Sequence, residues 1–97
     1  MELELKDNPE RKRYEAVVGG HTAFLEYIRT RDKIYLTHTE VPQELSGQGV
    51  GKNLVRKVLE EVKRLDLELV PLCPFVALYI KRNPEWRSLV MKGINIE

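Results

Sequence analysis

Gly47, Gly49 and Gly51 stand where the hydrophobic period of the chain changes. Before them, apolar and polar residues alternate, which is typical of β-strands with one buried face. After them, apolar side chains recur every three or four residues, which is typical of an amphipathic helix. The helical set comprises Val50, Leu54, Val55, Val58, Leu59, Val62 and Leu65. The change of period therefore predicts a strand, a glycine-rich turn and a long helix in direct succession.

The segments before the glycines are expected to form an antiparallel sheet. Gly19-Gly20 and Arg31-Asp32 are turn signals between extended runs, and strands joined by tight turns pair antiparallel. A short edge strand is expected at residues 2–5. The other expected strands comprise residues 13–18, 21–30 and 33–41.

The last of these strands carries several polar side chains. Strict alternation predicts that two sets of its residues lie on opposite faces of the sheet. One set is Ile34, Leu36, His38 and Glu40, and the other is Tyr35, Thr37, Thr39 and Val41. His38 and Glu40 are thus expected to share a face with two apolar residues.

After the long helix, residues 67–72 form a short apolar run that predicts a buried strand. Pro74 suits the first position of a helix over residues 75–82, because proline lacks the N–H that a helix start leaves unbonded. Pro84 opens a further helical turn, which Gly93 ends. The predicted order is β-β-β-β-α-β-α, an α+β fold with a mixed, mostly antiparallel sheet. A chain of 97 residues makes one domain, residues 1–97.

Charge and cysteine content argue against several functions. The net charge is +1, from 16 basic and 15 acidic side chains, so no nucleic-acid partner is expected. The basic run at residues 11–13 is flanked by Glu10 and Glu15 and is expected to be a solvated strand of mixed charge. Because Cys73 is the single cysteine, the sequence excludes an internal disulfide and a cysteine-based metal site. With no apolar run of ~20 residues and no signal-peptide pattern, we expect a cytoplasmic protein without a membrane partner.

The glycine segment is typical of an anion-binding helix start. Such a start is usually satisfied by a side-chain cap and by acidic residues in the first turn. Ser46 is a possible cap, but Gln48 and Lys52 stand where acids are usual. The positive end of the helix dipole, worth ~0.3–1 kcal/mol to an anion, is then free for a phosphate. The alternative is a flexible turn that only joins the strand to the helix.

Two nucleotide-binding motifs fail on spacing. A Walker loop requires a glycine five residues before the Gly51-Lys52 pair and Ser or Thr after it, where this chain has Ser46 and Asn53. The dinucleotide fingerprint requires Gly-x-Gly-x-x-Gly within a parallel βαβ unit. The spacing here is Gly-x-Gly-x-Gly, after strands expected to be antiparallel.

The glycine segment instead resembles the acetyl-CoA motif of the GNAT superfamily of N-acetyltransferases, Arg/Gln-x-x-Gly-x-Gly/Ala. The matching residues are Ser46-Gly47-Gln48-Gly49-Val50-Gly51, with serine in place of the usual Arg or Gln. Two further stretches, His38-Thr39-Glu40-Val41-Pro42 and Cys73-Pro74-Phe75, resemble a subfamily of minimal GNAT-like proteins of similar length. The resemblance covers residues 34–86.

The resemblance implies an acetyl-CoA-dependent N-acetyltransferase that transfers an acetyl group directly to an amine on a small molecule or a protein. The loop amides would hold the pyrophosphate, and the pantetheine arm would lie in a V between strands 33–41 and 67–72. The implied cofactor-binding residues are Thr39, Val41, Gly47, Gln48, Gly49, Val50, Gly51 and Lys52.

The acceptor side is less defined by the resemblance. Larger members carry two helices between their first two strands, where this chain has only residues 6–12. The acceptor site is therefore open or completed by a partner. A non-catalytic CoA-binding module and a protein-interaction domain with a vestigial loop remain alternatives.

Four side chains are candidates for the chemistry. Cys73 is expected to cap the helix that follows it, either as a nucleophile or as a small buried residue beside the thioester. By the resemblance, Tyr79 would protonate the departing thiolate; otherwise it packs with its hydroxyl at the rim. His38 and Glu40 are candidates for a general base, although a histidine among apolar neighbours is more often a hydrogen-bonded core group.

Overall fold

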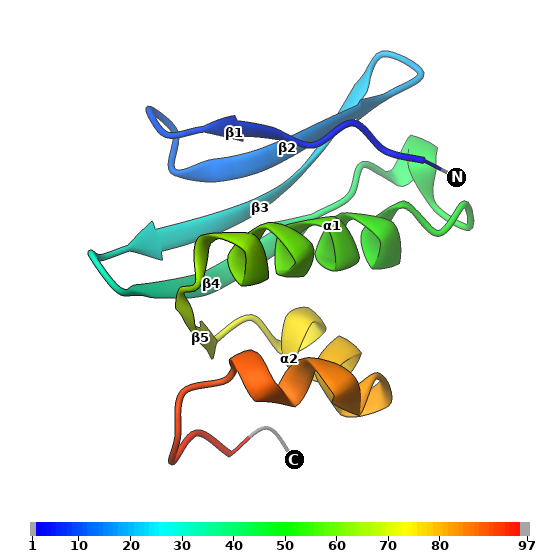
Figure 1. Cartoon of the computed structure of the whole chain (residues 1–97). Helices are drawn as coiled ribbons and strands as arrows, with labels where there is room; N and C mark the ends of the chain where they lie inside the picture. The colour runs from blue at the N-terminus through cyan, green and yellow to red at the C-terminus, as the bar shows by residue number, and fades with distance from the viewer. Residues whose placement is uncertain (1, 96–97) are drawn as a thin grey trace.

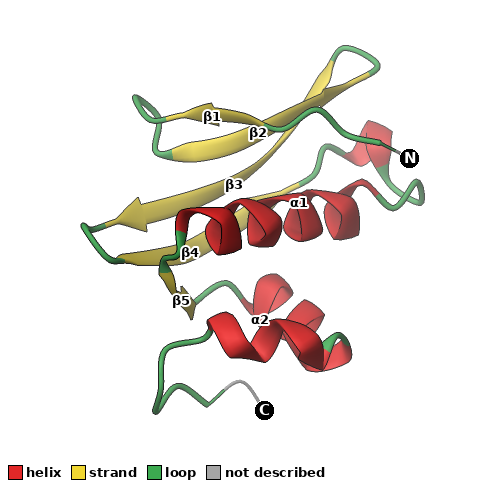
Figure 2. Ribbon diagram, viewed as in Figure 1, coloured by secondary structure: helices red, strands yellow, loops and turns green. Residues whose placement is uncertain are grey.

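Five strands form one sheet in the computed structural model, which describes residues 2–95 (Figure 1). They lie in chain order; β4 and β5 are parallel, and every other neighbouring pair is antiparallel. The strands are β1 Lys6–Asn8, β2 Arg13–Val18, β3 His21–Arg29, β4 Lys33–Glu40 and β5 Glu68–Pro71. The helices are α1 Val50–Leu65 and α2 Pro74–Arg82, with 3-10 turns η1 Gln43–Leu45 and η2 Pro84–Leu89. The predicted order and the α+β class are confirmed (Figure 2).

The edge strand lies later in the chain than its predicted position at residues 2–5. Leu3 is buried in the core and Glu2 forms an ion pair with Lys57 of α1, so this segment packs beside the helix. The chain joins the sheet at Lys6, which pairs with Glu15 of β2. Leucines that alternate with glutamates indicate a segment with one buried face. Residues 2–5 bury that face but form no strand of the sheet.

The apolar stripe of α1 lies across the sheet and forms the core with it (Figure 1). Its partners are the inward-facing residues of three strands, namely Tyr14, Ala16, Ala23, Leu25, Tyr27, Ile34 and Leu36. The helix ends at Asp66, whose φ of 56° is left-handed and whose N–H bonds to the carbonyls of Val62 and Lys63. This cap turns the chain directly into β5.

A β-bulge interrupts β4 in the middle. Leu36 pairs with Tyr27 of β3, but the next pair joins His38 to Glu26, so Thr37 is an extra residue on β4. The extra residue reverses the alternation of faces. Leu36 and Thr39 therefore point to the core side, and the predicted sharing of one face by Leu36 and His38 is wrong.

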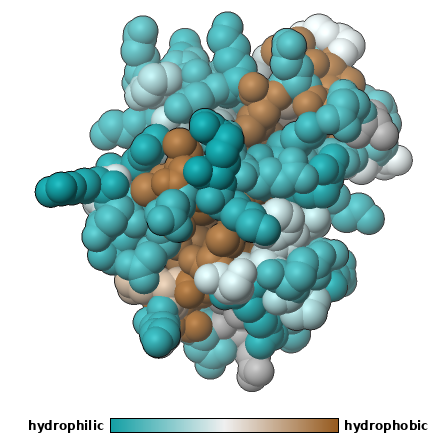
Figure 3. All heavy atoms as spheres, viewed as in Figure 1, coloured by the Kyte–Doolittle hydropathy of each residue, from teal (hydrophilic) through white to brown (hydrophobic). Residues whose placement is uncertain are grey.

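The surface seen in Figure 3 is mostly hydrophilic, with apolar side chains exposed in smaller areas between charged ones. Across residues 2–95, no helix is long and apolar enough to cross a membrane. Two large apolar side chains of α2, Phe75 and Leu78, are each 42% exposed. They belong to a pocket beside the glycine loop.

Candidate functional site

The loop between β4 and α1 bends at two glycines with left-handed backbone. Gly47 has φ 79°, and Gly49, the residue that begins α1 as its N-cap, has φ 75°. Residues with a Cβ adopt this region only at a cost in free energy, whereas glycine enters it freely. These two glycines therefore set the path by which the chain enters the helix.

The third glycine has a different role. A Cβ at Gly51 would lie 3.0 Å from Cζ of Phe75 and 3.4 Å from Cγ2 of Val41. Gly51 thus lets the ring of Phe75, from the first turn of α2, lie on the first turn of α1. The two helix starts are brought together at this point.

The start of α1 has no side-chain cap and no acidic residue in its first turn. Within residues 2–95, the N–H groups of Val50, Gly51 and Lys52 donate to no protein acceptor. Asn53 donates both its backbone N–H and its side-chain amide to the carbonyl of Gly49, at 3.1 and 2.9 Å. Asn53 therefore bonds to the carbonyl of Gly49, and the N–H groups of residues 50–52 remain free for an anion.

Ser46 does not cap α1, contrary to the role considered from the sequence. It ends η1, where its N–H donates to the carbonyl of Gln43 at 3.0 Å, and it precedes the N-cap of α1 by three residues. Gln48 is exposed and its side-chain amide turns back to the carbonyl of Glu44 at 3.4 Å. Neither side chain satisfies the start of the helix.

A shallow pocket of about 280 Å³ lies over this loop. It brings together most of the residues predicted for the cofactor. Its lining is Val41, Leu45, Ser46, Gly47, Gly49, Val50, Gly51, Lys52 and Phe75. The lining includes the cation Lys52 and no carboxylate, imidazole or thiol, so the pocket suits an anion rather than a metal ion.

The pairing of β4 with β5 ends halfway along β4. Leu36 pairs with Pro71, which has no N–H, and the N–H of Cys73 donates to the carbonyl of Leu36 at 2.8 Å as the last link. Beyond it, residues 37–40 have no strand partner on this side within the described chain. This divergence is the V expected from the resemblance, and it opens next to the glycine loop.

Thr39 and Cys73 meet at the inner wall of this gap. Cys73 is 4% exposed and is the N-cap of α2, as predicted, with Pro74 as the first helical residue. Its Sγ lies 3.3 Å from Oγ1 of Thr39. No other side-chain hydrogen bond to Cys73 occurs among the described residues, so the thiol has no carboxylate or imidazole in contact with it.

His38 and Glu40 form a pair on the opposite, outer face. Nε2 of His38 lies 2.8 Å from Oε1 of Glu40, and both side chains are more than half exposed. The imidazole lies near the ring of Phe24 on β3, with 6.3 Å between centroids. The predicted pair is therefore present, but it is a solvent-facing pair and not a group of the core.

Tyr79 lines a second pocket, of about 220 Å³, between α2 and the first turn of α1. Burial raises the pKa of the Tyr79 hydroxyl above its ordinary value. No hydrogen bond joins it to Cys73 within residues 2–95, and its role as an acid stays a prediction. Sequence reasoning missed the pocket, although Phe75, Leu78 and Arg82 follow a helical spacing that could have indicated it.

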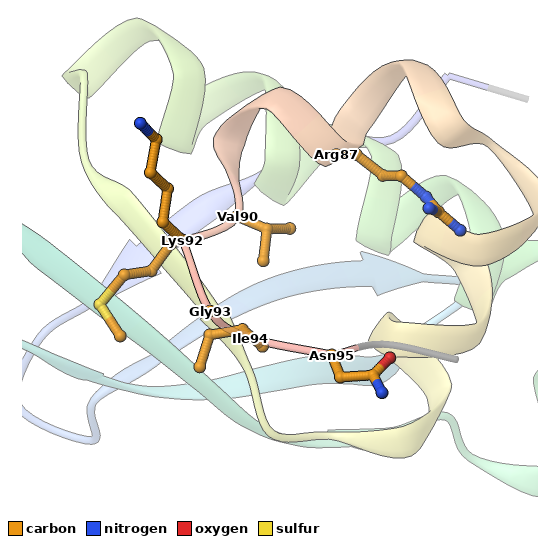
Figure 4. A pocket seen from close by; sticks show the side chains of 7 residues that line it. Arg87, Val90, Lys92, Gly93, Ile94 and Asn95 are labelled. Carbon is orange, nitrogen blue, oxygen red and sulfur yellow. The ribbon is translucent and has the colours of Figure 1, made fainter.

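Another hollow, of about 240 Å³, lies beside the C-terminal segment (Figure 4). Arg87, Val90 and residues 91–95 line it, and none of the predicted site residues is among them. Within residues 2–95, no group of three His, Cys, Asp or Glu side chains is arranged to hold a metal ion. The features that suit a ligand are therefore concentrated at the glycine loop.

Comparison with known proteins gives two results. The family model described as GCN5-related N-acetyl-transferase matches residues 13–89. The chain is also similar to Protein NATD1 of Gallus gallus, Mus musculus and Homo sapiens, with 37% identity over 59 residues in each case. These residues are 61% of this chain and 53%, 53% and 51% of those proteins. The chain thus spans about half the length of the curated relatives it matches.

Proposed function

The chain belongs to the GCN5-related N-acetyltransferase family, and from this premise we propose that it binds acetyl-coenzyme A at the glycine loop and transfers the acetyl group to an amine. The uncapped start of α1 supports this most strongly. Its first turn has free N–H donors, no acidic side chain and an adjoining pocket of about 280 Å³. A diphosphate is the ligand that this arrangement suits.

The residues fit the two polar parts of the cosubstrate. The amides of residues 50–52 would hold the diphosphate, and Lys52 is the cation among the residues that line this pocket. The unpaired side of residues 37–40 would bind the amide groups of the pantetheine arm, as an added strand would. The bound thioester supplies the acetyl group next to Thr39 and Cys73.

The acceptor amine would approach from the outer face. On the inner face, Sγ of Cys73 lies 3.3 Å from Oγ1 of Thr39, and Leu25, which pairs with Thr39, is fully buried. On the outer face, the side chains of His38 and Glu40 are 52% and 57% exposed. An amine that enters there meets the imidazole before it reaches the gap.

His38 is the proposed proton acceptor. Its Nε2 faces the carboxylate of Glu40, so we assign the ring proton to Nε2, which leaves Nδ1 as the acceptor. Nδ1 would take the proton that the attacking amine loses, directly or through one water. Glu40 would stabilise the resulting imidazolium. A positioned base of this kind contributes about 10²–10⁴-fold to rate.

Cys73 is proposed as a packing neighbour of the thioester and not as a nucleophile. Its only side-chain partner among the described residues is the hydroxyl of Thr39, which is not a base. Activated cysteines usually have an adjacent imidazole or cation. Direct attack by the amine needs no such partner.

A second candidate function is a CoA-binding module without turnover. Only the turn at residues 9–12 separates β1 from β2, so no helix of the described chain encloses an acceptor beside His38. In this case the protein would bind acetyl-CoA but acetylate nothing.

Incubation with acetyl-CoA and a panel of primary amines tests the proposal, with release of free thiol as the readout. We expect thiol release that depends on both the protein and an amine. Tight binding without release with any amine would favour the non-catalytic module. Intact mass after incubation with acetyl-CoA alone tests the role of Cys73, and an acetyl adduct that is absent from Cys73→Ala would contradict direct transfer.

A further inference from the structure

The outer face of the sheet carries an aromatic ring beside His38. Phe24 of β3 stands between Ala23 and Leu25, which are both fully buried, so its side chain points to the opposite face of the sheet. Phe24 is not a member of the hydrophobic core that α1 and the sheet form. Core packing therefore does not account for this ring.

The ring of Phe24 contacts side chains of both neighbouring strands. Arg13 of β2 and His38 of β4 each pair with Glu26, so both are diagonal neighbours of Phe24. The guanidinium carbon of Arg13 lies 4.1 Å from the centroid of the ring, which is a cation–π contact. The centroid of the His38 imidazole lies 6.3 Å from that of Phe24, with 57° between the two planes. Phe24 thus connects a cation on β2 to the imidazole on β4.

Arg13 is itself held in place. Its Nε donates to the carboxylate of Glu15 at 2.6 Å, and Glu15 also accepts a hydrogen bond from the side-chain amide of Asn8 on β1 at 3.2 Å. The side chains of Arg13 and Glu15 are only 18% and 16% exposed. This network keeps the guanidinium over the ring of Phe24.

The imidazole of His38 needs more than its bond to Glu40 to keep one orientation. Both side chains of that pair are more than half exposed, and exposed pairs of this kind contribute little because water competes for the same groups. The bond fixes the ring proton on Nε2 only while the imidazole stays in its present orientation. The contact with Phe24 is what limits rotation of the imidazole.

We propose that Phe24, held by Arg13, is a positioning residue for His38. It keeps the imidazole in the orientation in which Nε2 bonds to Glu40 and Nδ1 is free for the acceptor amine. The inference rests on the proposed function, because only a base requires a free Nδ1. Phe24 and Arg13 act through His38 and are not themselves catalytic.

Nitrogen NMR of the imidazole tests the assignment without any substrate, at about pH 8, where an ordinary imidazole is neutral. The wild-type protein should show one tautomer of His38, with the proton on Nε2. Phe24→Leu should show both tautomers in comparable amounts, and Arg13→Gln should change the populations in the same direction. Phe24→Tyr keeps an aromatic ring and should keep the wild-type spectrum.

Ile28→Ala is the matched control. Ile28 is another apolar residue on the outer face of β3, 54% exposed, and it pairs with Tyr35 and not with a residue beside His38. This variant should keep the single tautomer of His38 and wild-type turnover.

Kinetics provide the second readout. In the presence of an amine, Phe24→Leu should lower kcat about tenfold, because the base is in the productive orientation for a smaller part of the time. The dissociation constant for acetyl-coenzyme A should not change, and Phe24→Tyr should restore turnover.

A single Nε2–H tautomer in both Phe24→Leu and Arg13→Gln would overturn the assignment. A loss of turnover without a change of tautomer would also overturn it, since the effect would then not pass through His38. If Phe24→Leu does not fold, the spectrum of Arg13→Gln decides. If the wild-type protein acetylates no amine, the proposed function fails, and the spectra still decide whether Phe24 positions His38.

Discussion

Gly47, Gly49 and Gly51 meet two different physical demands within one loop. The first two adopt left-handed backbone, and the third allows the ring of Phe75 to lie on the helix start. Together they present the amides of the first turn of α1 without side chains in front of them. The spacing of the glycines is thus explained by the path of the backbone and by the packing of two helix starts.

His38 is the residue on which the proposed proton transfer depends. His38→Gln keeps a polar side chain of similar size but removes the ring nitrogen that accepts the proton. We expect turnover of acetyl-CoA with an amine to fall about 10²-fold, with the dissociation constant for acetyl-CoA unchanged. Steady-state kinetics and calorimetry on the same preparation measure the two effects.

His21→Gln is the matched control for this variant. His21 is the other histidine of the chain, and it lies at the start of β3, 4.0 Å from Glu44. It should retain wild-type turnover. If both variants lose turnover equally, or if His38→Gln loses none, His38 is not the base.

At the scale of elements, the change of hydrophobic period was sufficient to predict the loop and the start of α1, and the apolar run at residues 67–72 predicted β5. Pro74 marked the start of α2 because its missing N–H suits that position. The bulge at Thr37 was not predictable, because residues 34–40 alternate in the sequence as an unbroken strand does. The edge strand was misplaced because burial of Leu3 by packing gives the same pattern as strand pairing.

The sequence predicted the position of the site only where the path of the backbone determines it, at the glycine loop. The glycine motif located the loop. The helical spacing of Phe75 and Arg82 indicates one shared face of α2, but only the packing of α2 against α1 places that face beside the loop. The faces on which Thr39 and His38 lie depend on the bulge, which forms through pairing with β3. Tertiary contacts of this kind leave no local signal in a sequence.

Deleting Thr37 tests the role of the bulge. The deletion makes the Leu36–Tyr27 and His38–Glu26 pairs consecutive, so Leu36 and Thr39 stay on the core side while His38 and Glu40 stay outside. We expect the free energy of unfolding to fall by only about 1 kcal/mol, because the Thr37 hydrogen bond to the carbonyl of Glu26 is lost, as denaturant titration would measure. Thr37→Ala is the control and should cost about the same, since it removes the same hydrogen bond. A loss of about 3 kcal/mol or more in the deletion variant alone would mean that Thr37 is not an extra residue of β4 and that its removal moves His38 and Glu40 to the core side.

At the scale of the whole molecule, a tyrosine cluster links the three strands at the β1 edge. Tyr27 donates to Asp7 of β1 at 2.6 Å, and its ring lies 5.1 Å from that of Tyr14 on β2. Burial, with a smaller contribution from the Asp7 carboxylate, raises the pKa of Tyr14 from 10.0 to about 12. The folded state therefore holds the phenol proton more tightly than the unfolded state does.

Stability should accordingly decrease at alkaline pH. Between pH 10 and about 12, the unfolded chain loses the Tyr14 proton while the folded chain keeps it, so the free energy of unfolding falls as pH rises. Tyr14→Phe should reduce this decrease by about 2 kcal/mol over the interval. Denaturant titrations of both proteins at about pH 10, 11 and 12 measure the slope. Parallel curves for the two proteins would show that Tyr14 does not contribute.

The central claim is that the glycine loop binds the diphosphate of acetyl-coenzyme A, and calorimetry of Gly49→Glu tests it most directly. The new carboxylate would lie beside the first-turn amides, so affinity should fall at least about 100-fold, the loss of charge-assisted hydrogen bonds worth about 3 kcal/mol. Gly93→Glu is the control, because Gly93 is also left-handed, at φ 90°, in open space and outside the loop pocket. The control should bind as the wild type does. Unchanged affinity for acetyl-coenzyme A in a folded Gly49→Glu protein would contradict the account.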